Sequence, residues 1–439
     1  MTKKTAFILL FAASLGILIS CGTKLNTVSY KGSVNTSGYQ ADSLPAPYAT
    51  GSAKNFSKVI GWGNNKTPVA PKGFIVTKFA DGLDHPRWIY VASDGDVFVA
   101  QANTILKGIK KIGSKISRKI KTQHYGKSAN NIILFRDADK DGTFESRSVF
   151  LKGLNQPFGM LISGNHFYVA NTNNLMQYDY VKGATSITSA GKEISLLPGE
   201  GRHWTKNIIS NKKGDKIYIA VGSSSNVAED GLDKEVRRAS ILEINSDGSG
   251  EKIYASGLRN PVGMDWAPGT NTLWTAVNER DELGDELVPD YLTSVKEDGF
   301  YGWPYSYYGN HPDPRIKEQR PDLIEKATVP EVALGSHTAS LGLVFYDKKL
   351  FPEKYHNGAF IAQHGSWNRS IISGYKVVFV PFKNGKPDGK PEDFLTGFVN
   401  DLAKSEVHGR PVCVALLPDG SMLVTDDVSN TIWRISVSK

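Results

Sequence analysis

The chain has few of the features on which several classes of protein depend. Only two of its 439 residues are cysteines, Cys21 and Cys413, which excludes a disulfide framework. It has no C-x-x-C-H haem motif, no G-x-S-x-G nucleophile elbow, no Walker loop and no G-x-G-x-x-G that opens a helix. The sequence therefore gives no support to haem, serine-hydrolase, nucleotide-binding or nicotinamide-dependent functions. Cys413 lies in an apolar stretch and is expected to be a small buried hydrophobe.

Long apolar runs are scarce as well. The run from Phe7 to Ile19 is shorter than the roughly 20 residues that span a bilayer. Lysines precede it, and Leu18-Ile19-Ser20-Cys21 matches a bacterial lipobox. The pattern predicts a lipoprotein signal peptide over residues 1–20 and a lipidated Cys21, so the protein is expected to be exported and anchored to a membrane by acyl chains. An ordinary secretory signal is the alternative interpretation.

Charge and composition divide the rest of the chain. Residues 21–70 are rich in Ser, Gly, Asn, Pro and Lys and are predicted to form a flexible tether, and residues 71–439 one folded domain. Much of the net charge of +8 falls between Lys107 and Lys127. This insertion is either a patch for anionic lipid or an acidic protein, or a solvated loop, and we favour the loop. No nucleic-acid partner is expected for an exported lipoprotein.

Six segments of the chain follow one pattern: a polar cluster, an alternating apolar strand, a Gly/Asp/Asn turn, and a second strand such as VFVA or IYIA. They begin at residues 82, 153, 201, 257, 336 and 409. Repeated hairpins at long intervals are typical of propellers. The fold class predicted is all-β, a six-bladed β-propeller with four-stranded antiparallel blades and long functional loops. A strand at 73–79 is expected to complete the last blade by pairing with 431–437.

The polar clusters of the six segments differ in sequence although the strands do not. In a propeller the innermost strands begin at the same end of the central channel, so these clusters are expected to converge. They supply His85, Arg87, Asn155, Gln156, His203, Lys206, Arg259, Asn260, His337, His408 and Arg410. A ring that is mostly cationic and amide predicts a site for an anionic ligand.

His203 is the candidate catalytic residue of this ring. Its neighbours Arg202 and Lys206 are expected to lower its pKa and keep it neutral, able to act as a base. Arg259 and Arg410 can bind carboxylates in a bidentate manner, which favours a polycarboxylate ligand. The alternatives are a histidine that only caps a strand and arginines that pair with acids of neighbouring blades.

Two segments are rich in the oxygen donors that calcium prefers. The first runs from Asn278 to Glu286, where Glu279 and Asp281 are the candidate ligands. The second is Asp137-Ala138-Asp139-Lys140-Asp141-Gly142, the opening of a calcium loop, although Ser148 stands where an EF-hand has Glu. Asp137, Asp139 and Asp141 are the candidate ligands of a structural calcium ion there. An acidic solvated loop is the alternative in both places.

The chain resembles the soluble quinoprotein glucose/sorbosone dehydrogenase family, and most of all its L-sorbosone dehydrogenase-like branch. The resemblance covers about residues 72–437. Its motifs are GRHWTKNI, IYIAVGSSSNV, GLRNPVGMDW, NERDELGDEL, DGFYGWPYSYYG, HGSWNRS and GRPVCVALLPDGSMLVTDD. Two positions depart from the family: Arg202 stands where Asp precedes the base, and Asp281-Glu282 stand where the glucose dehydrogenases have Gly-Pro.

The resemblance implies pyrroloquinoline quinone (PQQ) and Ca²⁺ at the channel mouth. His203 would be the general base, and the loop around Glu279 and Asp281 would offer calcium ligands, largely through backbone carbonyls. The residues implied or expected to contact the cofactor are Arg259, Asn260, Arg410, Arg87, Lys206, Trp367 and Arg369. The activity expected is oxidation of an aldose or sugar aldehyde, with electrons passed to a separate acceptor. A calcium-dependent, lactonase-like propeller hydrolase and a non-catalytic binding propeller remain alternatives.

Overall fold

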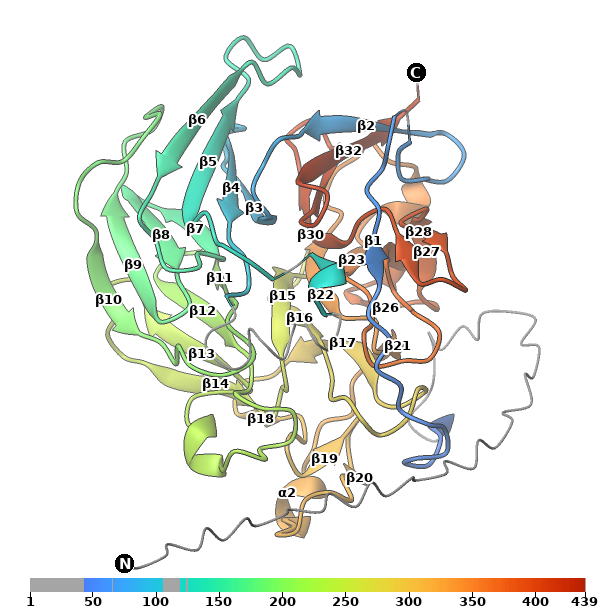
Figure 1. The fold of residues 1–439 in the computed structure, drawn as a ribbon. Helices are drawn as coiled ribbons and strands as arrows, with labels where there is room; N and C mark the ends of the chain where they lie inside the picture. The colour runs from blue at the N-terminus through green and yellow to red at the C-terminus, as the bar shows by residue number, and fades with distance from the viewer. Residues whose placement is uncertain (1–42, 65, 106–118, 124, 439) are drawn as a thin grey trace, which may run out of the picture. The chain divides into compact units, whose positions relative to one another are not determined.

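The structure is a computed structural model, and it describes residues 43–64, 66–105, 119–123 and 125–438 (Figure 1). The predicted signal peptide, Cys21 and most of the basic insertion lie outside these residues. Among the residues described, no helix is long and apolar enough to cross a membrane. The fold is all-β with few helices, as predicted.

The first three large sheets each follow one stretch of chain, and each is antiparallel over its four consecutive strands. Alternating apolar residues build these strands and Gly or Asp turns end them. Their strands are β3 (Pro86–Val91), β4 (Val97–Gln101), β5 (Asn131–Arg136) and β6 (Ser146–Leu151); β7 (Met160–Ser163), β8 (His166–Ala170), β9 (Asn174–Asp179) and β10 (Lys192–Leu196); β11 (Lys206–Ser210), β12 (Lys216–Val221), β13 (Ser240–Asn245) and β14 (Lys252–Ser256), with β18 (Gly299–Phe300) beside β14.

Three further four-stranded sheets follow in the second half of the chain. Their strands are β15 (Pro261–Trp266), β16 (Leu273–Val277), β17 (Pro289–Val295) and β21 (Val332–Ser336); β22 (Ser340–Phe345), β23 (Ala359–Gln363), β24 (Lys376–Val380) and β27 (Glu392–Leu395); β30 (Pro411–Leu416), β31 (Met422–Asp426), β32 (Thr431–Val437) and β2 (Phe74–Ala80). The predicted pairing of the N-terminal strand with the last strand is confirmed, because β2 pairs antiparallel with β32.

The first strands of the six large sheets contact one another in cyclic order, β3, β7, β11, β15, β22 and β30, and β30 contacts β3. Three glycines allow some of these contacts to be close. A Cβ added at Gly159, Gly263 or Gly342 would lie 2.4–2.6 Å from a backbone atom of the next first strand. The Gly in the repeated P-F-G-M and P-V-G-M motifs is therefore required by packing.

Aromatic side chains fill the space between the first two sheets. The ring of Phe98 on β4 lies 4.7 Å from that of Phe150 on β6 and 5.0 Å from that of Phe167 on β8, centroid to centroid. All three are fully buried. Each such ring contributes roughly 2–3 kcal/mol through burial, so this cluster holds the first two sheets together.

Residues 43–63, expected to belong to the flexible tether, contact the folded part of the chain. Strand β1 (Lys58–Val59) pairs with β29 (Glu406–Val407). Tyr48 N–H donates to the Leu283 carbonyl at 2.7 Å. Trp62 Nε1–H donates to Asp426 Oδ2 at 2.7 Å. The polar composition of this segment predicts no such contacts, because they are made mainly by backbone groups and by a few isolated side chains.

Candidate functional site

The candidate residues meet at one edge of the sheets because of strand register. In an antiparallel hairpin the start of the first strand pairs with the end of the second. Pro261 pairs with Val277, and Pro411 pairs with Asp426. Residues just before each first strand and just after each second strand therefore share an edge. Sequence reasoning used the first group and missed most of the second.

His203 lies just before β11 and has a defined tautomer. Its Nδ1 is 2.8 Å from the Ser223 carbonyl oxygen. A carbonyl only accepts, so Nδ1 carries the proton and Nε2 holds the lone pair. Burial, and then the charge of Arg259, lower the pKa of His203 to about 3. The ring is therefore neutral at pH 7, and no described residue donates to or accepts from Nε2.

The expected cause of this low pKa was only partly right. The cations that act on His203 are Arg259 and Arg238. Arg202 is exposed and pairs with Glu229 at 2.7 Å. Lys206 is fully buried and donates to the Trp204 carbonyl at 3.2 Å. The cations closest to His203 in the sequence are thus engaged elsewhere, and the two arginines that act on it come from other segments of the chain.

Arg259 is buried and held on several sides. Its Nη1 donates to the Glu279 carbonyl at 2.6 Å, and its Nη2 donates to Asn226 Oδ1 at 2.9 Å and to Asp281 Oδ2 at 3.3 Å. Asn226 Oδ1 also accepts from Asp281 N–H at 2.9 Å. Asn226, which sequence reasoning missed, thus joins the arginine to the loop after β16.

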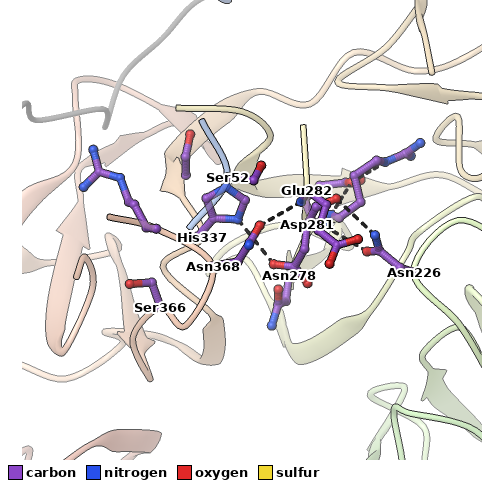
Figure 2. Close-up of polar contacts among 12 residues, drawn as sticks. Ser52, Asn226, Asn278, Asp281, Glu282, His337, Ser366 and Asn368 are labelled. Atoms are coloured by element: carbon purple, nitrogen blue, oxygen red, sulfur yellow. Dashed lines mark hydrogen bonds and ion pairs between the residues drawn. The ribbon is translucent and has the colours of Figure 1, made fainter. Parts of the chain in front are cut away.

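Asp281 and His337 form the other half of this cluster (Figure 2). Asp281 Oδ1 lies 3.3 Å from His337 Nδ1, and His337 Nε2 lies 2.8 Å from the Gly284 carbonyl oxygen. Burial would raise the pKa of Asp281, but His337 and Arg259 hold it below its usual value. Burial would lower the pKa of His337, but the hydrogen bond and charge of Asp281 raise it.

A second cluster joins Arg87 of β3 to the residues that directly follow β23 and β31. Arg87 Nη1 donates to Asp427 Oδ2 at 2.5 Å, and His364 Nε2 is 3.0 Å from Asp427 Oδ1. Burial lowers the pKa of His364 to about 4, and Arg410 adds to the effect. Arg410 donates to the carbonyls of His364 and Gly365, both at 2.9 Å. Both residues that sequence reasoning missed here, His364 and Asp427, directly follow second strands.

Arg87 and Lys206 connect this cluster to the side of the site that holds His203. The guanidinium of Arg87 lies 5.6 Å from the ring centroid of Trp204, which is next to His203. Burial lowers the pKa of Lys206 to about 7, and Arg238 adds to the effect. Lys206 forms no ion pair with any of the residues that the structure describes. A buried lysine with this pKa is partly protonated near pH 7, and a bound carboxylate would favour its charged form.

Trp367 and Arg369, predicted to contact a cofactor, contact other parts of the chain. Trp367 stacks on Phe56 with ring centroids 5.8 Å apart. Arg369 Nε donates to the Asp285 carbonyl at 3.1 Å, and its Nη2 pairs with Glu286. Both residues therefore support the segment 43–63 and the loop after β16.

The two predicted calcium segments differ in the structure. Glu279 Oε2 accepts from the backbone N–H and from Nε of Arg280, while its Oε1 is buried with no partner among the described residues. Asp281 is paired as above. In the other segment, Asp137, Asp139, Asp141 and Glu145 each place a carboxylate oxygen within 4.8 Å of the others. Such a cluster, although largely exposed, is compatible with calcium.

Comparison with known proteins gives one matching family model and several relatives. A family model described as TrAA12-like matches residues 68–298 and 317–438. A protein of Borreliella burgdorferi described as uncharacterized is 29% identical over 84% of this chain and 90% of its own. An aldose sugar dehydrogenase of Escherichia coli is 29% identical over 54% of this chain and 60% of its own. A PQQ-dependent pyranose dehydrogenase of Coprinopsis cinerea is 22% identical over 70% of this chain and 44% of its own.

Solved structures share the fold. A Trichoderma reesei enzyme of carbohydrate-active family AA12 superposes with a TM-score of 0.69 and 18% identity, over 88% of this chain and 100% of its own. The holo form of the Coprinopsis cinerea pyranose dehydrogenase PQQ domain gives a TM-score of 0.68 and 19% identity, over 87% and 100%. At these identities the structures establish the all-β fold.

Proposed function

Since the chain belongs to the TrAA12-like family, we propose that it oxidises a sugar with the help of PQQ. The observation that carries the proposal is His203, a neutral histidine whose Nε2 is available beside a buried arginine. Relatives named as PQQ-dependent pyranose dehydrogenase and aldose sugar dehydrogenase support it. The six large sheets, whose first strands contact one another in cyclic order, would be the blades of one propeller.

Several polar atoms at the edge fit a planar, anionic cofactor. Asn260 Oδ1 and Arg87 Nε are buried without partners among the described residues. The backbone at Gly222 approaches closely: a Cβ there would lie 2.2 Å from Asn260 Oδ1 and 2.6 Å from His203 Cβ. Arg259, Asn260, Arg87, Arg410 and Lys206 would hold PQQ, with the cations facing its carboxylates. When bound, PQQ supplies the acceptor for a hydride.

His203 would perform the proton transfer. Its Nε2 accepts the proton of the sugar hydroxyl while the hydrogen on the adjacent carbon leaves with its electron pair. The Ser223 carbonyl holds the ring by accepting from Nδ1–H. The charge of Arg259 favours the neutral ring before transfer. It also stabilises negative charge that develops on the substrate oxygen.

The finer assignments remain proposals. We propose an aldose or sorbosone-type sugar aldehyde as the substrate, a separate electron acceptor, and attachment to a membrane through Cys21 on the periplasmic side or outer surface. Calcium is proposed for the loop with Asp137, Asp139 and Asp141. At the loop with Glu279 and Asp281, side-chain donors already contact the Asp281 carbonyl and carboxylate oxygens, so no step is assigned to calcium there.

The test is a PQQ titration followed by dye reduction across a panel of aldoses and aldehydes. We expect saturable binding and turnover, and a loss of about 10²–10⁴-fold in kcat for His203→Gln with PQQ affinity retained. His166→Gln is the matched control, because that histidine is partly exposed and pairs only weakly with Asp179. Failure to bind PQQ, or full activity of His203→Gln, contradicts the proposal.

A further inference from the structure

The loop from Asn278 to Glu286 is enclosed by cationic side chains that bond to its backbone. Arg259 donates to the carbonyls of residues 278 and 279 at 3.3 and 2.6 Å. Arg369 donates to that of residue 285 at 3.1 Å. His337 Nε2 lies 2.8 Å from that of residue 284. Carbonyl oxygens are ligands that calcium prefers, and these four each accept a hydrogen bond from a side-chain N–H group.

Arg315 makes the decisive contact. Its Nη1 donates to the Asp281 carbonyl oxygen at 2.7 Å. Asn226 Nδ2–H donates to the same oxygen at 3.0 Å. A carbonyl oxygen has two lone pairs, so these two donors use its full capacity. A metal ion could coordinate this oxygen only if one of the donors withdrew.

Asp313 orients Arg315 toward the loop. Its two carboxylate oxygens accept from Nε at 2.9 Å and from Nη2 at 2.7 Å of Arg315. This bidentate pair fixes the guanidinium plane and leaves Nη1 directed at Asp281. Asp313 is itself fully buried and also accepts from Arg280 Nη1 at 3.0 Å. The arginine is therefore placed by a rigid, charge-balanced network.

The segment that carries Arg315 contacts the loop at more than one residue. Residues 299–316 lie between the two stretches that the family model matches. The same segment contributes Trp303, whose Nε1–H donates to the Asn226 carbonyl at 3.0 Å. It also supplies the carbonyls of Pro304 and Ser306, which accept from Arg280. The insertion thus reaches the loop after β16 at several points.

We propose that Arg315 is an internal cation that takes the place of a calcium ion at the Asp281 carbonyl, so that the loop 278–286 is held in its working shape without metal. The consequence for cofactor binding rests on the proposed function. The consequence for metal binding does not, because it is measured on the protein without PQQ.

The experiment measures terbium and calcium binding to the protein without PQQ, in the Asp139→Asn/Asp141→Asn background that removes the exposed acidic cluster. Terbium luminescence sensitised by tryptophan reports site occupancy, and calcium competition confirms it. In this background we expect no saturable uptake below about 1 mM, since the carbonyl is occupied. Adding Arg315→Ala should create a site at least about 10-fold tighter, because the Asp281 carbonyl and the Asp313 carboxylate both lose the donor that Arg315 supplies.

Two further variants control this test. Arg315→Lys keeps a donor and a positive charge, so it should remain without a site. Arg320→Gln removes an arginine of the same region that pairs with exposed Asp322, and should also leave uptake absent. Saturable uptake by the background protein overturns the proposal even if Arg315→Ala does not fold. Absence of uptake by a folded Arg315→Ala variant overturns it as well, because something other than Arg315 then closes the loop.

A PQQ titration in chelator separates this proposal from the proposed function. If PQQ binds with the same affinity in EDTA and in calcium, both proposals are supported. If PQQ does not bind under either condition, the proposed function fails while the metal measurement still decides the role of Arg315. If calcium tightens PQQ binding about 10-fold or more in the background protein, the internal-cation proposal is wrong.

Discussion

Two acidic loops of this protein look alike in sequence and differ in structure. The loop from Asp137 to Glu145 is largely exposed, and its carboxylates accept mainly from backbone N–H groups of the same loop, such as Gly142 to Asp137 at 2.8 Å. The loop from Asn278 to Glu286 is largely buried and bonds to arginines and a histidine from distant segments. Oxygen-rich composition alone therefore does not identify a metal site; what matters is whether side chains already occupy the oxygens.

Removal of Arg280 should produce the largest loss of stability, because this residue belongs to the ion-pair network of the buried loop. Arg280 is fully buried and pairs with Glu279 at 2.9 Å and Asp313 at 3.0 Å. Arg280→Met leaves two buried carboxylates with too few donors, and we expect unfolding free energy to fall by about 3–5 kcal/mol. Urea denaturation measures this loss.

The control for Arg280 is an exposed arginine in the same part of the chain. Arg320 pairs with Asp322 at 2.6 Å, with both side chains about half exposed. Arg320→Met is expected to leave the unfolding free energy almost unchanged, since water replaces the lost partner. Equal losses for the two variants would mean that burial of the loop network does not govern its stability.

The general plan of the protein was predictable from its sequence, because strand alternation and turn residues are local signals. The pairing of β2 with β32 and the common edge of His203 and Arg259 follow from the repeat alone. Asn226 and Asp427 were missed, although the register rule that places residues after second strands at that edge could have identified them. Arg315 has no local signal: its role depends on the conformation of a long insertion.

His337 provides a pH-dependent test of the buried loop. Its folded pKa is raised by Asp281, with Asp290 adding to the effect, so its stabilising contribution is complete below the unfolded pKa of about 6.5 and is lost as pH rises through the folded pKa. His337→Asn, which tolerates the positive φ of 59° at this position, should cost about 2 kcal/mol at pH 5.5 and less at pH 9.

The measurement is the difference in unfolding free energy between the wild-type protein and His337→Asn, taken at pH 5.5 and at pH 9. His203 acts in the opposite direction, because its low pKa favours the folded state above pH 6.5 and disfavours it as pH falls. It is present in both proteins, so its contribution cancels in the difference. A loss that grows with rising pH would show that His337 is not a charged partner of Asp281.

Calcium should produce the smallest effect, on the exposed loop. Arg434 Nη1 donates to the Gly142 carbonyl at 2.7 Å, which ties this loop to β32. Calcium that gathers Asp137, Asp139, Asp141 and Glu145 would therefore stabilise a segment already joined to a sheet. We expect calcium to raise the thermal midpoint by about 2 °C, and Asp139→Asn/Asp141→Asn to abolish the rise. A calcium-dependent rise that survives in that variant would show that the ion binds at another site. The exposed loop would then differ from the buried loop in no way that matters for calcium.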